Sequence, residues 1–486
     1  MIRIQITLFL FLIIGSSLAQ NISTQNLYDS YSSYKEPALN GREIKHADIE
    51  PLILELKSND LFRIKLLGRS LEGRGIYLVS LGHGKTDILA WSQMHGDEPT
   101  ATRAVFDVLN FFKTNDNFNE IKKSILEKLT INFIPMLNPD GAQVYQRRNA
   151  VSVDLNRDAL RTEFPESQIL KSVRDSINPQ FGFNLHDQST RYSAGNSHRT
   201  AAISFLAPAF NYNKTLNDTR KNTMKVIAAI YKNLKQIIPG HMGRYNDDFE
   251  PRAFGDNLVK WGTGSILIES GGWKNDVEKE FIRKLNFIAL LSSFKIIADK
   301  EYENEEITSY YNIPENDKLI FDLLLRNLSI KFNNKNYIID LGINRIEKAN
   351  NDASKIYYKG EIADIGDLSI YYGNDEFDCS NMEAVPGKIY PEIFDTFDEI
   401  AKLDFLSMLK QGYTTVRIKG SVDKKFINIP INIVCAEATV DHSVKVDNNA
   451  NIIILKKNNP RFAIVNGYLY DLETKTNNVL NSLVFK

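Results

Sequence analysis

Between about residues 60 and 300, the pattern of hydrophobic and polar positions alternates between two kinds of segment. Short apolar runs rich in β-branched residues, bounded by polar stretches, predict buried strands. These runs lie at 76–81, 87–92, 130–137, 181–185, 201–207 and 265–269. Segments with apolar residues three and four positions apart predict helices at 99–112, 222–238 and 277–297. Strands that alternate with helices predict a three-layer α/β domain.

The last third of the chain has a different pattern. A polar, acidic connector over 300–316 is followed by a predicted helix at 318–326. Short strand-like runs then lie between clusters of Asn, Gly and Asp, at 337–344, 431–434, 451–455 and 462–470. We therefore expect a mostly β accessory domain over 318–486.

The first residues have the pattern of a cleavable signal peptide. Arg3 precedes an apolar run at 6–14, and the small residues Ser17 and Ala19 fit a cleavage site after residue 19. About nine apolar residues are too few to span roughly 30 Å of hydrocarbon. We expect 1–19 to be removed, no transmembrane anchor, and a secreted or periplasmic protein. Residues 20–44 are polar and are expected to be a linker rather than a short pro-segment, with the first domain covering 45–300.

Composition and charge exclude several classes of protein. The chain has 486 residues, enough for two domains, and its 43% hydrophobic and 24% charged residues exclude collagen-like, disordered and polytopic membrane classes. A net charge of -1 provides no general attraction to nucleic acid or to an anionic membrane. Cys379 and Cys435 are too few for a disulfide framework. Export would permit a bridge between them, and two free thiols are the alternative.

Candidate metal ligands follow two of the predicted strands. His95 and Glu98 lie between a strand and a helix, and together they form half of a tetrahedral zinc site. His186 is at the exit of the strand at 181–185. Because sites in α/β sheets form at the carboxyl ends of strands, these three side chains can meet there, with a fourth position open for water. The alternatives are a solvated turn for His95 and Glu98 and a hydrogen-bonded core histidine for His186.

Two further segments contain residues suited to the same chemistry. Residues 147–157 include Arg147, Arg148 and Arg157, whose guanidinium groups can bind a carboxylate with two hydrogen bonds; the alternative is a basic surface loop. Glu269 ends the apolar run at 265–269, where a buried carboxylate is costly unless it is used or paired. Beside a zinc-bound water, Glu269 could act as a general base.

Taken together, these segments resemble the zinc carboxypeptidase family, the carboxypeptidase A-like metallopeptidases, over about residues 45 to 300. The motifs are HGDE (95–98), RRNAVSVDLNR (147–157), LHDQ (185–188) and IESGG (268–272), in the order of the family. The resemblance implies a mixed β-sheet between helices, with one Zn²⁺ held by His95, Glu98 and His186. It also implies that Asp154 accepts a hydrogen bond from the second ring nitrogen of His95.

The same resemblance implies roles for residues that meet the substrate. Asn156 and Arg157 would bind the free C-terminal carboxylate of a peptide. Arg147 would stabilise the oxyanion, with Arg148 as the alternative, and Glu269 would serve as general base and then as general acid. Tyr245 corresponds approximately to a mobile tyrosine over the substrate. The residue that sets side-chain preference is expected near 254–256, where Phe254 would favour an apolar partner and Asp256 a basic one.

The C-terminal region has a fainter likeness to the composite β-domain of amidohydrolases. The segments concerned are 365–368, 386–391, 412–417 and 464–467. The His-x-His metal motif of that domain is missing after the Pro-Gly of 386–387, so an accessory domain is expected rather than a second active site.

The sequence therefore predicts an exported, zinc-dependent carboxypeptidase acting on peptides. The alternatives are hydrolysis of a peptidoglycan stem peptide or of an N-acyl amino acid at the same site, or a catalytically silent binding protein. A silent protein has no physical need for an open metal position beside a base.

Overall fold

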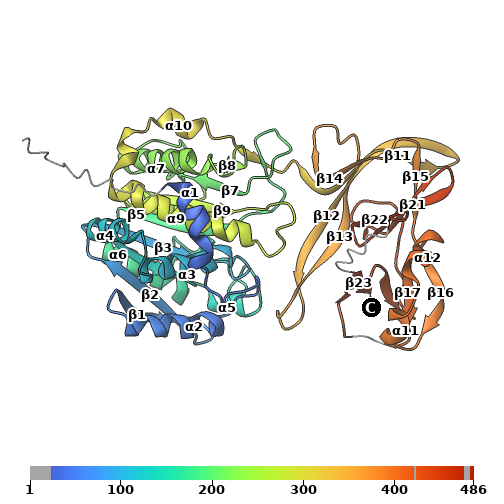
Figure 1. The fold of residues 1–486 in the computed structure, drawn as a ribbon, viewed down its shortest axis with the longest axis horizontal. Helices are drawn as coiled ribbons and strands as arrows, with labels where there is room; N and C mark the ends of the chain where they lie inside the picture. Colours follow the sequence, from blue (N-terminus) through green and yellow to red (C-terminus); the bar gives the residue numbers. More distant parts are fainter. Residues whose placement is uncertain (1–22, 421–422, 475–481, 486) are drawn as a thin grey trace, which may run out of the picture.

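The computed structural model describes residues 23–420, 423–474 and 482–485, which form two lobes (Figure 1). The first lobe contains α-helices and a β-sheet, and the second is mostly β. This arrangement confirms the predicted fold class. The predicted signal peptide, residues 1–19, lies outside the described residues. Among the described residues, no helix has the length and apolar character needed to cross a membrane.

The first lobe is built on a mixed sheet of eight strands in the order β1-β2-β4-β3-β5-β9-β7-β8. The strands β4, β3, β5 and β9 run parallel to one another, and antiparallel pairs flank them. Their bounds are β1 Phe62–Arg69, β2 Gly75–Gly82, β3 Thr86–Ser92, β4 Leu129–Ile134, β5 Phe181–Asp187, β7 Ile203–Leu206, β8 Met242–Arg244 and β9 Gly264–Ser270. The six predicted strands of this region are confirmed, although β4 ends three residues before its predicted end.

Helices cover both faces of this sheet because successive strand residues point to opposite faces. In β3, Ile88 and Ala90 pack into one hydrophobic cluster, whereas Leu89 and Trp91 pack into another. The first cluster includes residues of α1, α3, α4, α7 and α9, and the second includes residues of α6 and α8. These helices are α1 Thr24–Ser30, α3 Thr100–Lys113, α4 Asn119–Lys128, α6 Pro165–Ile177, α7 Asp218–Leu234, α8 Phe254–Lys260 and α9 Glu280–Ala298.

The expectation of a linker at 20–44 is wrong for the described part of that segment. Leu27 and Leu39 are fully buried in the first cluster, together with Tyr31. Polar contacts hold the segment as well, since Arg283 on α9 donates to the carbonyl oxygen of Leu39 and pairs with the buried Asp107. The apolar residues are widely spaced among polar ones, so the composition is polar although the segment belongs to the core.

The second lobe contains two sheets among the described residues. One has the strand order β13-β12-β11-β15-β20-β21-β22, with β14 pairing with β11, and the other has the order β16-β17-β19-β23-β18. The first sheet comprises β11 Ile320–Phe332, β12 Lys335–Ala349, β13 Ile356–Gly366, β14 Tyr372–Asp378, β15 Met382–Pro386, β20 Ile452–Lys456, β21 Asn459–Val465 and β22 Tyr468–Asp471. The second comprises β16 Lys388–Phe394, β17 Tyr413–Ile418, β18 Phe426–Ile427, β19 Asn432–Cys435 and β23 Ser482–Phe485. Two short helices, α11 Phe397–Ala401 and α12 Phe405–Lys410, accompany them.

Two predictions of local structure in the second lobe are wrong. The helix expected at 318–326 is the first half of strand β11, because Leu323 and Leu325 pair with β12 on one side and β14 on the other. The strand expected at 462–470 is a hairpin of β21 and β22, which turns at Asn466 and Gly467, both with positive φ. Cys379 and Cys435 are buried free thiols.

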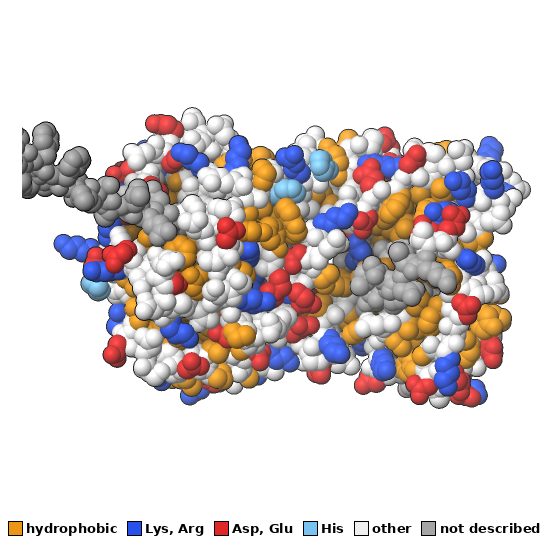
Figure 2. Space-filling view, viewed as in Figure 1, with side chains coloured by type: hydrophobic (Ala, Val, Ile, Leu, Met, Phe, Trp, Pro, Cys, Tyr) orange, Lys and Arg blue, Asp and Glu red, His pale blue; other side chains and the backbone are white. Residues whose placement is uncertain are grey.

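The surface carries charges of both signs. Figure 2 shows acidic and basic side chains interspersed along the junction of the two lobes on the face in view. On this face the two signs are mixed, in agreement with the net charge of -1.

Candidate functional site

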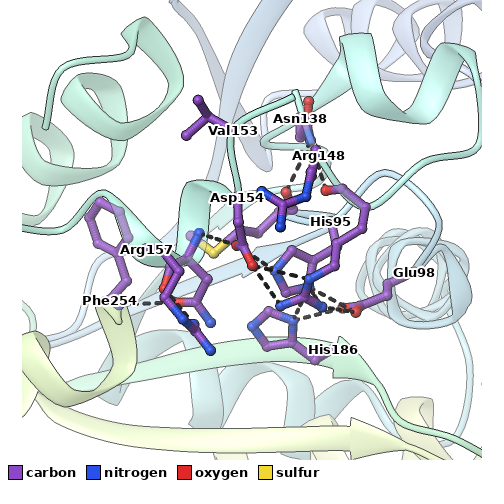
Figure 3. Close-up of polar contacts among 12 residues, drawn as sticks. His95, Glu98, Asn138, Arg148, Val153, Asp154, Arg157, His186 and Phe254 are labelled. Carbon is purple, nitrogen blue, oxygen red and sulfur yellow. Dashed lines mark hydrogen bonds and ion pairs between the residues drawn. The ribbon is translucent and has the colours of Figure 1, made fainter. Parts of the chain in front are cut away.

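Three buried side chains converge where β3 and β5 end. His95 and Glu98 lie in the loop between β3 and α3, and His186 is near the end of β5. The Nδ1 atom of His95 is 2.8 Å from Oε1 of Glu98, and Nδ1 of His186 is 2.7 Å from Oε2 of Glu98. The two Nδ1 atoms are 3.1 Å apart (Figure 3). Two imidazole nitrogens and one carboxylate form the ligand set that catalytic zinc sites use, so the three residues fit the ion.

The electrostatics of the group keep its carboxylate ionised. Burial alone would raise the pKa of Glu98, but the imidazoles of His95 and His186 outweigh burial and hold that pKa well below its ordinary value. An ionised carboxylate can coordinate a cation directly.

Asp154 orients the first histidine. Its Oδ1 atom is 3.2 Å from Nε2 of His95, on the opposite side of the ring from Glu98. A proton on Nε2 can be donated to Asp154, which leaves the lone pair of Nδ1 directed toward Glu98 and His186. Asp154 also accepts from the backbone N–H of Asn156 at 2.9 Å, so its own position is fixed. In contrast, Nε2 of His186 is buried and has no hydrogen-bond partner among the described residues.

Arg147 reaches the ligand group from the solvent side. Its Nη1 atom lies 3.0 Å from Nδ1 of His95 and 3.3 Å from Oε1 of Glu98, and its Nε donates to Asp154. The Arg147 side chain is 42% exposed, so it borders the open side of the site. Arg148 instead donates to the carbonyl oxygen of Ser152. The structure therefore places Arg147, and not Arg148, beside the candidate ligands.

Glu269 is the neighbour of His186 across the sheet. β5 and β9 are parallel, and their register pairs these two residues directly. Paired residues on adjacent strands point to the same face of a sheet, about 5 Å apart at the backbone. Burial and then the charge of Glu98 raise the pKa of the Glu269 carboxyl. Glu269 on β9 thus lies directly beside His186 on β5.

Asn156 and Arg157 follow Asp154 in a short 3₁₀ turn, Leu155–Arg157. The side-chain oxygen of Asn156 accepts from the backbone N–H of Phe254 at 2.9 Å, and Nε of Arg157 pairs with Glu250 at 3.2 Å. In Figure 3, Arg157 lies on the side of Asp154 away from Glu98. The side chains of Asn156 and Arg157 thus bind Phe254 and Glu250 rather than the three candidate ligands.

Two tyrosines face each other next to the site. The hydroxyl of Tyr245, directly after β8, is 3.2 Å from that of Tyr192. Burial, the contact with Tyr192 and the charge of Glu269 raise the pKa of Tyr245, in that order. Sequence reasoning missed Tyr192, because the loop after β5 contains no motif that singles it out.

The segment expected to set side-chain preference is largely enclosed. Phe254 is fully buried and packs with Trp261 in the core. Asp256 is 8% exposed and accepts from the backbone N–H of Glu250, and burial raises its pKa to about 7. The choice between Phe254 and Asp256 as the preference residue stays open.

A buried ion pair behind the ligands was also missed. Asp187 follows His186, and its backbone N–H donates to Oε2 of Glu98 at 3.2 Å. Its carboxylate accepts from Thr100 at 2.5 Å and from Lys279 at 3.0 Å. The signal was available in the LHDQ motif, where an acidic residue directly follows a candidate ligand.

Comparison with known proteins finds similarity to zinc carboxypeptidases in part of the chain. The family model described as "Zinc carboxypeptidase" matches residues 53–229. This range contains His95, Glu98, Arg147, residues 154–157 and His186, and it ends before Tyr245 and Glu269. Carboxypeptidase SOL1 of Arabidopsis thaliana is 28% identical over 115 residues, which cover 22% of this chain and 23% of that protein. Carboxypeptidase 2 of Trichophyton tonsurans is 26% identical over 129 residues, which cover 24% and 23%.

A solved structure of a metallo-carboxypeptidase from Burkholderia cenocepacia aligns with a TM-score of 0.42 and 16% identity, covering 53% of this chain and 69% of that one. The chain spans about a quarter of the length of the two curated relatives. The family model covers three of the four motifs on which the resemblance was based. The match over residues 53–229 confirms the resemblance of this chain to the zinc carboxypeptidase family.

Proposed function

We propose that this chain is an exported, zinc-dependent carboxypeptidase that hydrolyses the C-terminal peptide bond of a peptide with a free carboxylate. The observation that carries the proposal is the convergence of His95, Glu98 and His186, with Arg147 on the open side. Zinc held by the three ligands would supply Lewis-acid activation of water and of the scissile carbonyl.

The remaining chemistry belongs to side chains of this chain. Glu269, paired in register with His186, would take a proton from the attacking water and later give it to the leaving amine. Arg147 would donate hydrogen bonds to the carbonyl oxygen as negative charge develops on it. Because that charge is largest in the transition state, loss of Arg147 would lower kcat more than it raises KM.

Asn156 and Arg157 would select the C-terminal end of the substrate peptide. A guanidinium that binds the terminal carboxylate requires a free C-terminus, which makes the enzyme an exopeptidase. In the structure Arg157 is paired with Glu250 and is 35% exposed, so a substrate carboxylate would compete with Glu250 for the guanidinium.

The proposal is tested with pairs of peptides that differ only at the C-terminus, one a free acid and the other an amide. Release of amino acids from the free acid alone supports it. Equal cleavage of both contradicts the exopeptidase role of Asn156 and Arg157. If the protein hydrolyses only peptidoglycan stem peptides or N-acyl amino acids, one of these is the substrate instead of a peptide. If the protein binds zinc but hydrolyses none of these compounds, it is a binding protein.

A further inference from the structure

The second lobe lies against loops that follow the strands of the site. After β5, the two-residue strand β6 (Ser193–Ala194) pairs with β10 (Asn316–Asp317), directly before the second lobe. After β9, Nζ of Lys274 is 2.9 Å from the carboxylate of Asp375 in β14. These contacts place the accessory domain at the sheet edge that holds His95, Glu98 and His186 (Figure 1).

The hairpin of β12 and β13 makes the most buried of these contacts. Glu347 on β12 accepts from both terminal nitrogens of Arg42, with Nη2 at 3.0 Å, and from the hydroxyl of Tyr145 at 2.8 Å. The Arg42 side chain is 7% exposed. The Glu347 side chain is 29% exposed, so the cost of separating the pair comes mainly from the buried Arg42, whose guanidinium would lose its charged partner. The hairpin is thus fixed to Arg42 and to Tyr145.

Tyr145 is held in an unusual backbone conformation. Its φ is +50°, in the left-handed region that residues with a side chain rarely adopt, and such a conformation persists only where surrounding contacts hold it. The phenol is buried, and its hydroxyl group is bonded to Glu347. Two local backbone hydrogen bonds hold the same turn: the N–H of Tyr145 donates to the carbonyl of Ala142 at 3.2 Å, and the N–H of Gln146 donates to the carbonyl of Gly141 at 2.9 Å.

Arg147 follows Tyr145 by two residues. It is the residue whose guanidinium lies beside His95 and Glu98. A shift of the backbone at Tyr145 would therefore be transmitted to the residue that stabilises the oxyanion in the proposed reaction, and misplacement by about 1 Å can reduce a rate by about a hundredfold.

We propose that Glu347 and Tyr145 are positioning residues for catalysis: the accessory domain, through Glu347, anchors Tyr145 and so fixes the segment that presents Arg147. The inference rests on the proposed function, because it relies on the role of Arg147 there. It assigns the C-terminal domain a part in building the active site.

The test uses Tyr145→Phe in the full-length, zinc-loaded protein. Phenylalanine keeps the buried ring and leaves the Arg42–Glu347 pair in place, so the variant removes only the anchoring hydroxyl. The expected result is a loss of kcat of between about threefold and a hundredfold, with KM within about twofold of wild type and zinc content unchanged. In an Arg147→Ala background, the same change should cause no further loss of kcat, because Tyr145 acts through Arg147.

Lys45→Met is the matched control. Lys45 donates to the carbonyl of Asp352 at the tip of the same hairpin, but it does not contact Tyr145 or Glu347. This variant should keep the kcat of the wild type. A kcat loss in Lys45→Met equal to that in Tyr145→Phe would overturn the inference, because general loosening of the hairpin would then explain both.

Hydrogen exchange provides a readout that needs no activity. Tyr145→Phe should speed amide exchange of residues 144–148 in the zinc-loaded protein, and Lys45→Met should not. An unchanged rate of amide exchange in Tyr145→Phe would overturn the inference. An unchanged kcat in Tyr145→Phe would overturn it as well, and so would a loss of kcat that is fully additive with the loss in Arg147→Ala. If the wild type cleaves no peptide, the proposed function fails, and exchange alone decides whether Tyr145 is anchored.

Discussion

The substitution Asp154→Asn tests how the candidate zinc site is oriented. The carboxylate of Asp154 contacts Nε2 of His95 at 3.2 Å and the Arg147 guanidinium at 3.0 Å. Asparagine has nearly the same shape, but it has no charge and only one acceptor oxygen. If its amide N–H₂ group turns toward His95, the imidazole proton moves to Nδ1 and the lone pair that would bind zinc is lost.

The expected magnitude follows from the role of this contact. Loss of a carboxylate that orients a ligating histidine weakens metal binding about 10- to 100-fold, or about 1.4 to 2.7 kcal/mol. Asp154→Asn should also lower kcat/KM beyond the effect on zinc, because Arg147 loses its charged partner. Both effects arise from one carboxylate, so they should appear together.

The assay is competition for zinc between the apoprotein and a chelating dye, followed by peptide hydrolysis at saturating zinc. Asp158→Asn is the matched control, because the Asp158 carboxylate accepts from the backbone N–H of Phe164 and does not contact the ligand group. The control should bind zinc as the wild type does. A folded Asp154→Asn protein with zinc affinity within about twofold of wild type would refute the orienting role of Asp154.

Two further predictions concern stability. Asp107→Asn removes the buried carboxylate that pairs with the fully buried Arg283 and leaves Arg283 only Glu280, at 3.9 Å, as a charged partner. This change should lower the free energy of unfolding by about 3 to 5 kcal/mol in urea titrations, whereas a loss below about 1 kcal/mol would contradict a structural role of the Asp107–Arg283 pair. Burial raises the pKa of Asp256 to about 7 in the folded protein. The unfolded chain therefore loses the Asp256 proton at a lower pH than the folded protein does. As a result, the contribution of Asp256 to the free energy of unfolding falls as the pH rises from about 4 to about 7. Asp256→Asn should therefore stabilise the protein at pH 8 by a few kcal/mol more than at pH 4, and an equal effect at both pH values would show that Asp256 ionises normally.

Much of the first domain could be predicted from the sequence, because its signals are local. Strand β5 is buried from Phe181 to His186, and the candidate ligands lie near the ends of β5 and β3. The order of the motifs then predicted that His95, Glu98 and His186 would meet, and the structure brings their ligand atoms within 4.8 Å of one another. Arg147 was distinguished from Arg148 only by the three-dimensional contacts.

The errors occurred where structure depends on distant partners. The segment 318–326 has leucines at spacings compatible with a helix, but β12 and β14 on either side make it a strand. Residues 23–44 are polar in composition, and their docking depends on α9, more than two hundred residues later. The contact of Arg42 with Glu347 joins residues 305 positions apart, and no local pattern indicates it.

The substitution Glu269→Gln tests whether Glu269 and the candidate zinc ligands form one hydrolytic site. Zinc content and the release of amino acids from a mixed peptide library would be measured for the wild type and the variant side by side. We expect one zinc per chain in both proteins, sequential C-terminal release by the wild type, and loss of most of the turnover in the variant. Full activity in Glu269→Gln, or a wild-type protein that binds no zinc, would contradict this expectation.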